Sequence, residues 1–157
     1  MATQTVSSMW GQNIIKVNKL TAAGALSTTW TTLPVAVEGS FSLTTTAGDR
    51  MEARIEGGGL EDVKYKPNTA TVEFEIRAGG GRDTPPIAHV NGVVDGRYAL
   101  QIQPENTALN GIQIDMATAR CEETWTAEEG FKWKYTFDVL MPTDGQMIKF
   151  KKLSATA

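Results

Sequence analysis

The chain has 157 residues, of which 41% are hydrophobic and 21% charged, and its formal net charge is −3. A chain of this size and composition is expected to fold as one globular domain, residues 1–157, around a hydrophobic core. The negative charge argues against a basic surface that grips nucleic acid, and the single cysteine excludes an internal disulfide bond. No apolar run approaches the roughly 20 residues of a membrane-spanning helix.

The first part of the chain predicts an arm followed by short strands. Residues 1–12 are small and polar, and we expect a flexible N-terminal arm without a secretion signal, on a protein that folds in a cytoplasm. A strand is expected at 14–17, and alternating apolar residues predict another within 38–45. The Thr-, Ala- and Gly-rich stretch 21–32 predicts a loop or a weak edge strand, and a turn is expected at 46–49.

Two stretches in the middle of the chain alternate strictly between apolar and charged residues. The odd-numbered positions of Arg50–Glu56 and the even-numbered positions of Thr71–Arg77 are apolar and are expected to face the core. A further short strand is expected between them, at Leu60–Tyr65. We expect the two charged strands to be neighbours that share one polar face, where opposite charges attract across the strands. The charged residues of that face are Glu52, Arg54, Glu56, Glu73, Glu75 and Arg77.

The stretch Ala78–Arg97 has little regular pattern. It contains three consecutive glycines, two consecutive prolines and the pairs Asn91-Gly92 and Asp95-Gly96. An irregular stretch of this length is uncommon in a compact domain and is often functional. Because Asn-Gly and Asp-Gly pairs tolerate positive φ in tight hairpins, we expect a long loop or a small protruding hairpin here.

The second half of the chain predicts mostly strands. In Phe131–Leu140, aromatic and β-branched residues alternate with polar ones, which is typical of a strand with one buried face and one solvated face. The alternation slips by one residue at Ala117, which predicts a β-bulge. Pro104–Gly111 is long enough for a turn or a single helical turn. Further strands are expected at 98–102, 112–116 and 146–151. We therefore predict an all-β fold, a small β-sandwich or barrel with at most one short helix.

The residues that carry most enzyme chemistry are scarce. His89 is the only histidine, and we interpret it as a solvent-facing residue of the long loop rather than as a catalytic base. We interpret Cys121 as a buried, inert thiol. One histidine and one cysteine cannot supply a zinc site, and the glycine runs lack the Lys-Ser/Thr pair of a phosphate-binding loop. The sequence predicts a protein that is not an enzyme and has no cofactor.

The pattern resembles the tail tube (major tail) proteins of bacteriophages over most of Leu33–Phe150. The stretches that carry the resemblance are Glu38–Leu43, Arg50–Glu56, Thr71–Arg77, Leu100–Pro104 and Gly130–Pro142. The resemblance implies a small β-sandwich or barrel of which six copies form a ring, with inner strands joined into one β-barrel around a channel. It also implies that rings stack into a tube, that an arm or long loop reaches the next ring, and that DNA passes through the channel.

The resemblance also implies partners, a location and residue roles. We expect a homo-oligomer in the virion tail, assembled in the host cytoplasm, that contacts tape measure, tail terminator and baseplate proteins and no membrane. DNA is expected to pass without specific binding, because carboxylates in the channel wall would repel its phosphates. The candidates for the channel wall are Glu52, Arg54, Glu56, Glu73, Glu75 and Arg77. The arm and the long loop would form contacts between rings, with Arg82, Asp83, Pro85, Pro86 and His89 as candidates.

Two alternatives stay open at this point. One is another virion or secretion-tube component of similar fold. The other is a carbohydrate-binding β-sandwich module in which Trp125 and Trp133 form the binding platform. In our preferred interpretation these two tryptophans fill the core or an interface.

Overall fold

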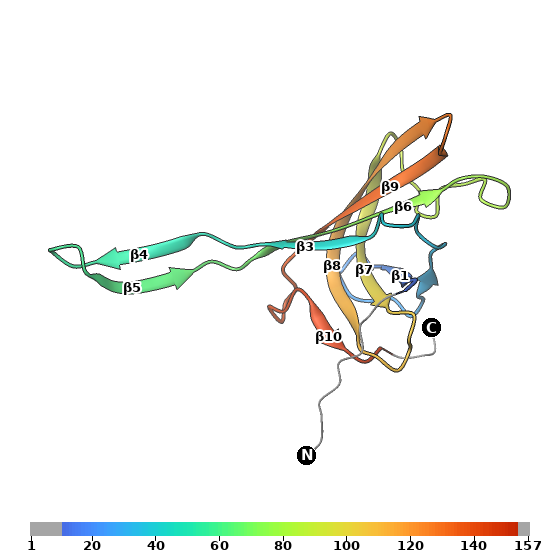
Figure 1. Cartoon of the computed structure of the whole chain (residues 1–157). Helices are drawn as coiled ribbons and strands as arrows, with labels where there is room; N and C mark the ends of the chain where they lie inside the picture. The colour runs from blue at the N-terminus through green and yellow to red at the C-terminus, as the bar shows by residue number, and fades with distance from the viewer. Residues whose placement is uncertain (1–10, 154–157) are drawn as a thin grey trace, which may run out of the picture.

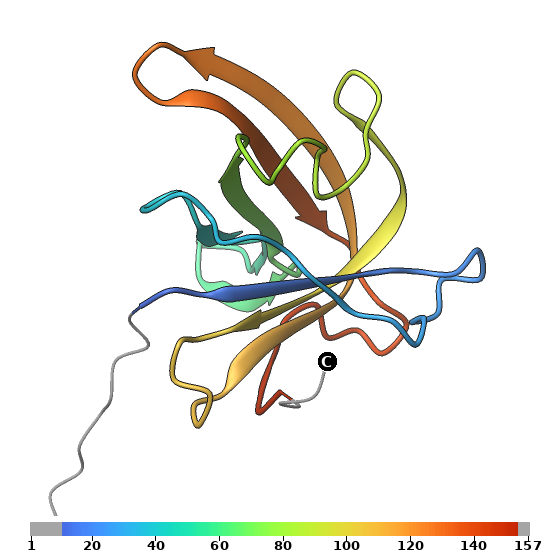
Figure 2. The same ribbon diagram turned by 90° about the vertical axis from the view of Figure 1, so that its right-hand side faces the viewer.

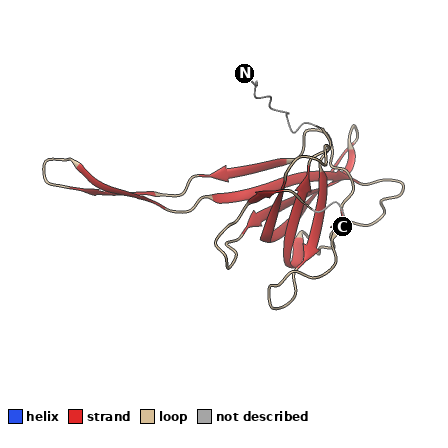
Figure 3. Cartoon of the chain, turned by 90° about the horizontal axis from the view of Figure 1, so that it is seen from below, coloured by secondary structure: helices blue, strands red, loops and turns tan. Residues whose placement is uncertain are grey.

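The computed structural model describes residues 11–153, so all but the last two residues of the expected arm 1–12 lie outside the described part of the chain. Within 11–153 the chain forms strands and loops and no helix (Figure 3). The all-β prediction is therefore confirmed, and the stretch at 104–110 is a connection between two strands. The strands are β1 (Ile14–Lys19), β2 (Thr31–Thr32), β3 (Ser42–Thr46), β4 (Arg50–Arg54), β5 (Leu60–Tyr65), β6 (Thr69–Arg77), β7 (Val93–Gln103), β8 (Gly111–Thr126), β9 (Gly130–Val139) and β10 (Lys149–Lys151).

Eight strands form one antiparallel sheet that wraps around a single core. The strands follow the order β2-β1-β7-β8-β9-β6-β3, and β10 pairs with β8 beside this path. Figure 2 shows the sheet folding back on itself, so that β1 crosses opposite the strands at the other end of the order. Side chains from both ends of the order, including Ile15 of β1 and Val72 of β6, belong to the same buried cluster. This arrangement is a small β-sandwich.

Aromatic residues of β6 and β9 fill the centre of the core. Phe74, Tyr135 and Phe137 are completely buried, and the ring of Phe74 lies 5.8 Å from that of Tyr135 and 5.7 Å from that of Phe137. Burying one large apolar side chain contributes about 1.5–3 kcal/mol. The alternating patterns of 71–77 and 131–140 therefore predicted these two buried faces correctly.

The pairing of β7 with β8 is irregular at two places. The register passes from Tyr98–Ala117 to Leu100–Ile114, so β8 carries one extra residue, close to the bulge predicted at Ala117. A second shift lies around Asp95-Gly96 of β7. This pair therefore lies inside a bulged strand and not in a hairpin turn, because a bulge accepts the positive φ of glycine as readily as a turn does.

The predicted loop Ala78–Arg97 is shorter in the structure, since β7 already begins at Val93. The turn expected at Asn91-Gly92 is confirmed: Val90 and Val93 bond to each other across it, and both turn residues have positive φ. The hydroxyl of Tyr135 holds the middle of the loop, because it accepts a hydrogen bond from the amide of Ile87 (3.2 Å) and donates one to its carbonyl (2.9 Å).

β4 and β5 form a two-stranded ribbon that projects from the body of the protein (Figure 1). β3 and β6 pair as far as Thr46 and Thr69, and the chain then continues outward into the ribbon, which we define as residues 47–68. The expected turn at 46–49 is therefore wrong. Gly48 lies where the two chains pass very closely, since a Cβ there would lie 2.2 Å from the carbonyl oxygen of Lys66.

Candidate functional site

The outer side of the sheet formed by β8, β9, β6 and β3 is polar, and we call it the polar face. Directly paired residues in antiparallel strands point to the same side of a sheet, so the register defines this face row by row. The rows are Thr124–Lys132–Arg77, Glu122–Lys134–Glu75, Arg120–Thr136–Glu73–Ser42 and Thr118–Asp138–Thr71–Thr44. Basic and acidic residues balance in these rows, and the remaining positions are Ser and Thr. The face therefore presents hydroxyl groups and charges of both signs rather than one sign of charge.

Lys132 neutralises two of the carboxylates near the polar face. Its side chain is 9% exposed, and its Nζ donates hydrogen bonds to Glu75, at 3.3 Å, and to Glu129. The bond to Glu129 raises the pKa of Lys132, although loss of hydration opposes this rise. The hydrogen bond and the charge of Lys132 lower the pKa of Glu129. Glu73 makes no salt bridge within residues 11–153, so its charge acts more freely than that of Glu75.

The polar face ends at two unpaired strand edges within the described part of the chain. β3 is the last strand of the sheet order, so one of its edges has no partner strand. The last five residues of β8, from Glu122 to Thr126, pair only with β9, because the pairing of β8 with β7 stops at Arg120. Unpaired N–H and C=O groups along a strand edge are a template for pairing with another chain.

The charged strand 50–56 is not a neighbour of 71–77, which corrects the sequence prediction. β4 pairs with β5 in the ribbon, whereas β6 pairs with β3 and β9. Glu52 and Arg54 lie on β4, and Glu56 lies in the turn of the ribbon; this half of the expected set is thus separate from Glu73, Glu75 and Arg77. The two halves do not form one polar face.

The apolar residues of the stretch Arg50–Glu56 do not face the core, which is a second correction. Met51 and Ile55 are 50% and 53% exposed, and the opposite side of the ribbon exposes Leu60 and Tyr65. On that side, Glu52 forms salt bridges with Arg50 and Arg54, all three on the same strand, β4. Alternation in the sequence indicates an apolar face, but it does not say whether this chain or another covers that face.

The free end of the β8–β9 hairpin carries exposed aromatic residues. Trp125 is 75% exposed and its ring lies 5.5 Å from that of Phe131, which in turn lies 5.6 Å from that of Trp133. Arg82 and Asp83 line the same cleft of about 480 Å³. We call Trp125, Phe131 and these two loop residues the aromatic end. Trp133 is only 3% exposed and belongs to the core, which agrees with our preferred interpretation of this residue and excludes the alternative of a platform made of two exposed tryptophans.

Four of the five residues expected to contact another ring line one cleft beside β2: Arg82, Asp83, Pro85 and Pro86. Arg82 and Asp83 also lie at the aromatic end, and Pro85 and Pro86 are half-buried. His89 is half-buried rather than solvent-facing. Its Nδ1 accepts a hydrogen bond from the amide of Gly92 (3.1 Å), and its Nε2 is buried without a partner among the described residues.

Cys121 is buried, as expected from the sequence. Burial is the main cause that raises the pKa of its thiol to about 11, and the negative charge of Glu123 adds to this effect. A thiol with such a pKa stays protonated near neutral pH and is a poor nucleophile.

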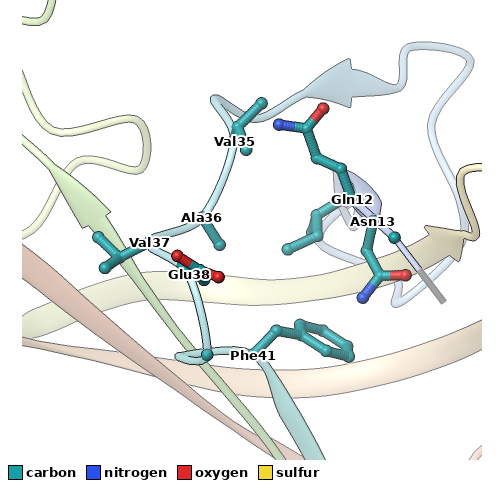
Figure 4. A pocket seen from close by; sticks show the side chains of 10 residues that line it. Gln12, Asn13, Val35, Ala36, Val37, Glu38 and Phe41 are labelled. Atoms are coloured by element: carbon teal, nitrogen blue, oxygen red, sulfur yellow. The ribbon is translucent and has the colours of Figure 1, made fainter.

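A cleft of about 410 Å³ lies between β1 and the segment that leads into β3 (Figure 4). Ile15, Val35 and Phe41 supply apolar surface, and the side chain of Glu38 points into the cleft. Its described lining also includes amide side chains but no histidine or cysteine. Within residues 11–153, no cluster of three or more His, Cys, Asp or Glu is arranged to hold a metal ion.

Comparison with known proteins adds no relative. No protein-family model matches the sequence. No curated protein matches it either. Residues 11–153 contain no helix that is long and apolar enough to cross a membrane.

Proposed function

We propose that this chain is the structural subunit of a bacteriophage tail tube, which assembles into stacked hexameric rings around a channel for DNA. One observation carries the proposal most directly: a sheet with a charge-balanced polar face ends in two unpaired strand edges. A sheet of this kind can gain a strand from another copy at each edge. The resemblance of the sequence to tail tube proteins supports the same conclusion.

The two edges differ, and this difference determines the kind of assembly. One edge is β3 and the other is the last five residues of β8, so a contact between them is head-to-tail. Head-to-tail contacts generate a closed ring when the rotation between copies closes, and a helical filament when it does not. In the proposed ring the polar faces of all copies line the channel.

The chemistry of the polar face suits DNA that must pass without being held. Affinity for DNA comes chiefly from cations that contact phosphates. The basic residues of the polar face are balanced by an equal number of carboxylates, and Lys132 is already bonded to Glu75 and Glu129. We therefore propose Glu73, Glu75 and Arg77 as channel-lining residues, together with Lys134 and Glu122. The ribbon residues Glu52, Arg54 and Glu56 are left out of this wall.

The proposal is tested by the assembly state of the purified chain. Electron microscopy at high protein concentration is expected to show rings or filaments with a central hole, and native mass spectrometry is expected to detect six-membered rings. A sample that stays monomeric and dispersed at all concentrations would contradict the proposal. Co-expression with tape measure, tail terminator and baseplate proteins is expected to yield tubes of defined length.

A further inference from the structure

We infer that copies of this chain join along the tube by docking the ribbon of one copy on the aromatic end of the next copy. The inference rests on the proposed function, because it needs an assembly of identical chains. The inference goes beyond that function because it names the two surfaces that contact each other. Three observations support it: the ribbon contacts no other strand of the described structure, the two surfaces lie at opposite ends of the same pair of strands, and charges of opposite sign lie on the two surfaces.

The ribbon lacks support from its own chain. β4 and β5 contact each other and no other strand of the described structure. A single two-stranded hairpin is at best marginally stable in water, and three or more strands or a packed apolar face are needed for stability. The ribbon exposes apolar side chains on both faces, Met51 and Ile55 on one and Leu60 and Tyr65 on the other. Both faces would gain stability from a surface that covers them.

The aromatic end offers a rigid, exposed apolar surface that could cover the ribbon of another copy. Trp125 is among the most exposed large apolar side chains of the described chain, although it belongs to the core-facing side of β8. Its neighbour Phe131 packs between Trp125 and the buried Trp133, so the exposed aromatic surface is continuous with a rigid core. Aromatic side chains that become buried when two proteins associate contribute most of the binding energy of many interfaces.

The ribbon and the aromatic end lie at opposite ends of the same pair of strands. The β6–β9 ladder runs from Thr71–Asp138 to Arg77–Lys132. The ribbon extends beyond the first of these pairs, and the β8–β9 hairpin that carries Trp125 extends beyond the second (Figure 1). The aromatic end of one chain therefore cannot cover the ribbon of the same chain. Copies arranged in the same orientation along this axis place the ribbon of one beside the aromatic end of the next.

Unpaired charges favour the same contact. Lys64 lies directly opposite Met51 on one face of the ribbon and makes no salt bridge within residues 11–153. Glu123 and Glu128, on either side of Trp125 in the sequence, make none within that range either. Opposite charges at an interface orient the partners and suppress wrong arrangements.

A cross-linking experiment tests the inference. Two variants of the full chain, Ala53→Cys in the ribbon and Glu128→Cys beside Trp125, are mixed, assembled and treated with a short bifunctional maleimide. Peptide mass spectrometry is expected to find residue 53 of one copy linked to residue 128 of another. The buried thiol of Cys121 is expected to stay unlabelled, and the wild-type chain is the control for this.

Matched substitutions show whether the contact stabilises the assembly. Met51→Asp is compared with Met141→Asp, because these methionines are 50% and 48% exposed but Met141 lies outside the ribbon and the aromatic end. Trp125→Ala is compared with Phe150→Ala in the same way. The variants of the ribbon and the aromatic end are expected to raise the protein concentration needed for tube formation about tenfold or more, and the two controls are expected to leave it unchanged.

The outcomes separate this inference from the proposed function. Tubes that form without a link between residues 53 and 128, or that tolerate Met51→Asp and Trp125→Ala as well as the controls, would overturn the inference and leave the proposed function intact. A chain that forms no ring or filament under any condition would overturn both.

Discussion

Tyr135 is the residue that connects the aromatic core to the loop at 78–92. Its ring is completely buried against Phe74, and its hydroxyl bonds both the amide and the carbonyl of the buried Ile87. Burial raises the pKa of this hydroxyl strongly, so it remains protonated and can donate to the carbonyl. The position of the loop, and of Arg82 and Asp83 within it, therefore depends on one side chain of β9.

The first prediction is that Tyr135→Phe destabilises the protein by about 1–3 kcal/mol, because it leaves buried polar groups of Ile87 unsatisfied. Urea unfolding monitored by tryptophan fluorescence measures the change. Tyr98→Phe is the control, since the hydroxyl of Tyr98 has no hydrogen-bond partner among the described residues. Equal stability of Tyr135→Phe and wild type would contradict the assigned role.

The second prediction concerns the thiol of Cys121. Its pKa rises from 9.0 to about 11, so the folded chain contains about 100-fold less thiolate near pH 8 than the unfolded chain. Alkylation of Cys121 by iodoacetamide at pH 8 is therefore expected to be at least that much slower in buffer than in urea. Because the pKa is higher in the folded state, the neutral thiol contributes its full stabilisation of the folded state below the pKa of the unfolded chain. This contribution declines as the pH rises toward 11. Equal alkylation rates in the two solvents would show that the thiol is not buried.

At the level of elements, the sequence predicted the buried strands and also the two strands of the ribbon, but it did not predict how the ribbon strands pair or that their apolar residues are exposed. The alternation in β6 and β9 reflects a face that this chain covers itself, so the pattern and the structure agree. Arg50–Glu56 shows the same alternation, yet its apolar face is exposed in the single chain. The start of β7 was missed because Asp95-Gly96 indicates a turn, whereas the structure uses this pair in a bulge. The periodicity of the sequence indicates that one face of a strand is apolar, but only the tertiary structure shows what covers that face.

The third prediction follows from the independence of the ribbon. Replacing residues 47–68 by Asn-Gly joins Thr46 to Thr69, which are register partners and are suited to a two-residue hairpin turn. The body is expected to keep its free energy of unfolding within about 1 kcal/mol, because β4 and β5 contact no other strand among the described residues. Formation of tubes is expected to be lost. Circular dichroism with urea unfolding measures the first effect, and sedimentation measures the second. Unimpaired tubes, or an unfolded body, would contradict this view of the ribbon.

At the level of the whole molecule, the balance of charge on the polar face is the property that bears on function. Glu75 is bonded to Lys132, so reversing its charge would place two cations together and would also disturb folding. Glu73 makes no salt bridge within residues 11–153, and it faces Ser42 and Thr136 across its neighbouring strands. Glu73 is therefore the better position at which to alter the proposed channel without altering the fold.

The fourth prediction is that tubes of Glu73→Lys retain DNA that wild-type tubes release. The substitution changes the charge at this position from −1 to +1 in every subunit, and cations supply most of the affinity for phosphates. Short fluorescent duplex DNA is expected to sediment with the variant tubes at low salt and to dissociate as salt rises. Glu105→Lys makes the same charge change in the exposed connection between β7 and β8 and is the control. Equal retention by both variants would count against the polar face as the channel wall.

The projecting ribbon also makes the chain sensitive to proteases, and this sensitivity is expected to differ between free and assembled subunits. It carries Arg50, Arg54, Lys64 and Lys66, all exposed in the single chain, on a segment that a protease can reach from several sides. Trypsin should therefore nick free subunits at the ribbon first and leave the sandwich whole. Subunits that are part of a tube should resist trypsin at the ribbon. The fraction of chains nicked in a short digestion would therefore measure the fraction of subunits that are not yet assembled.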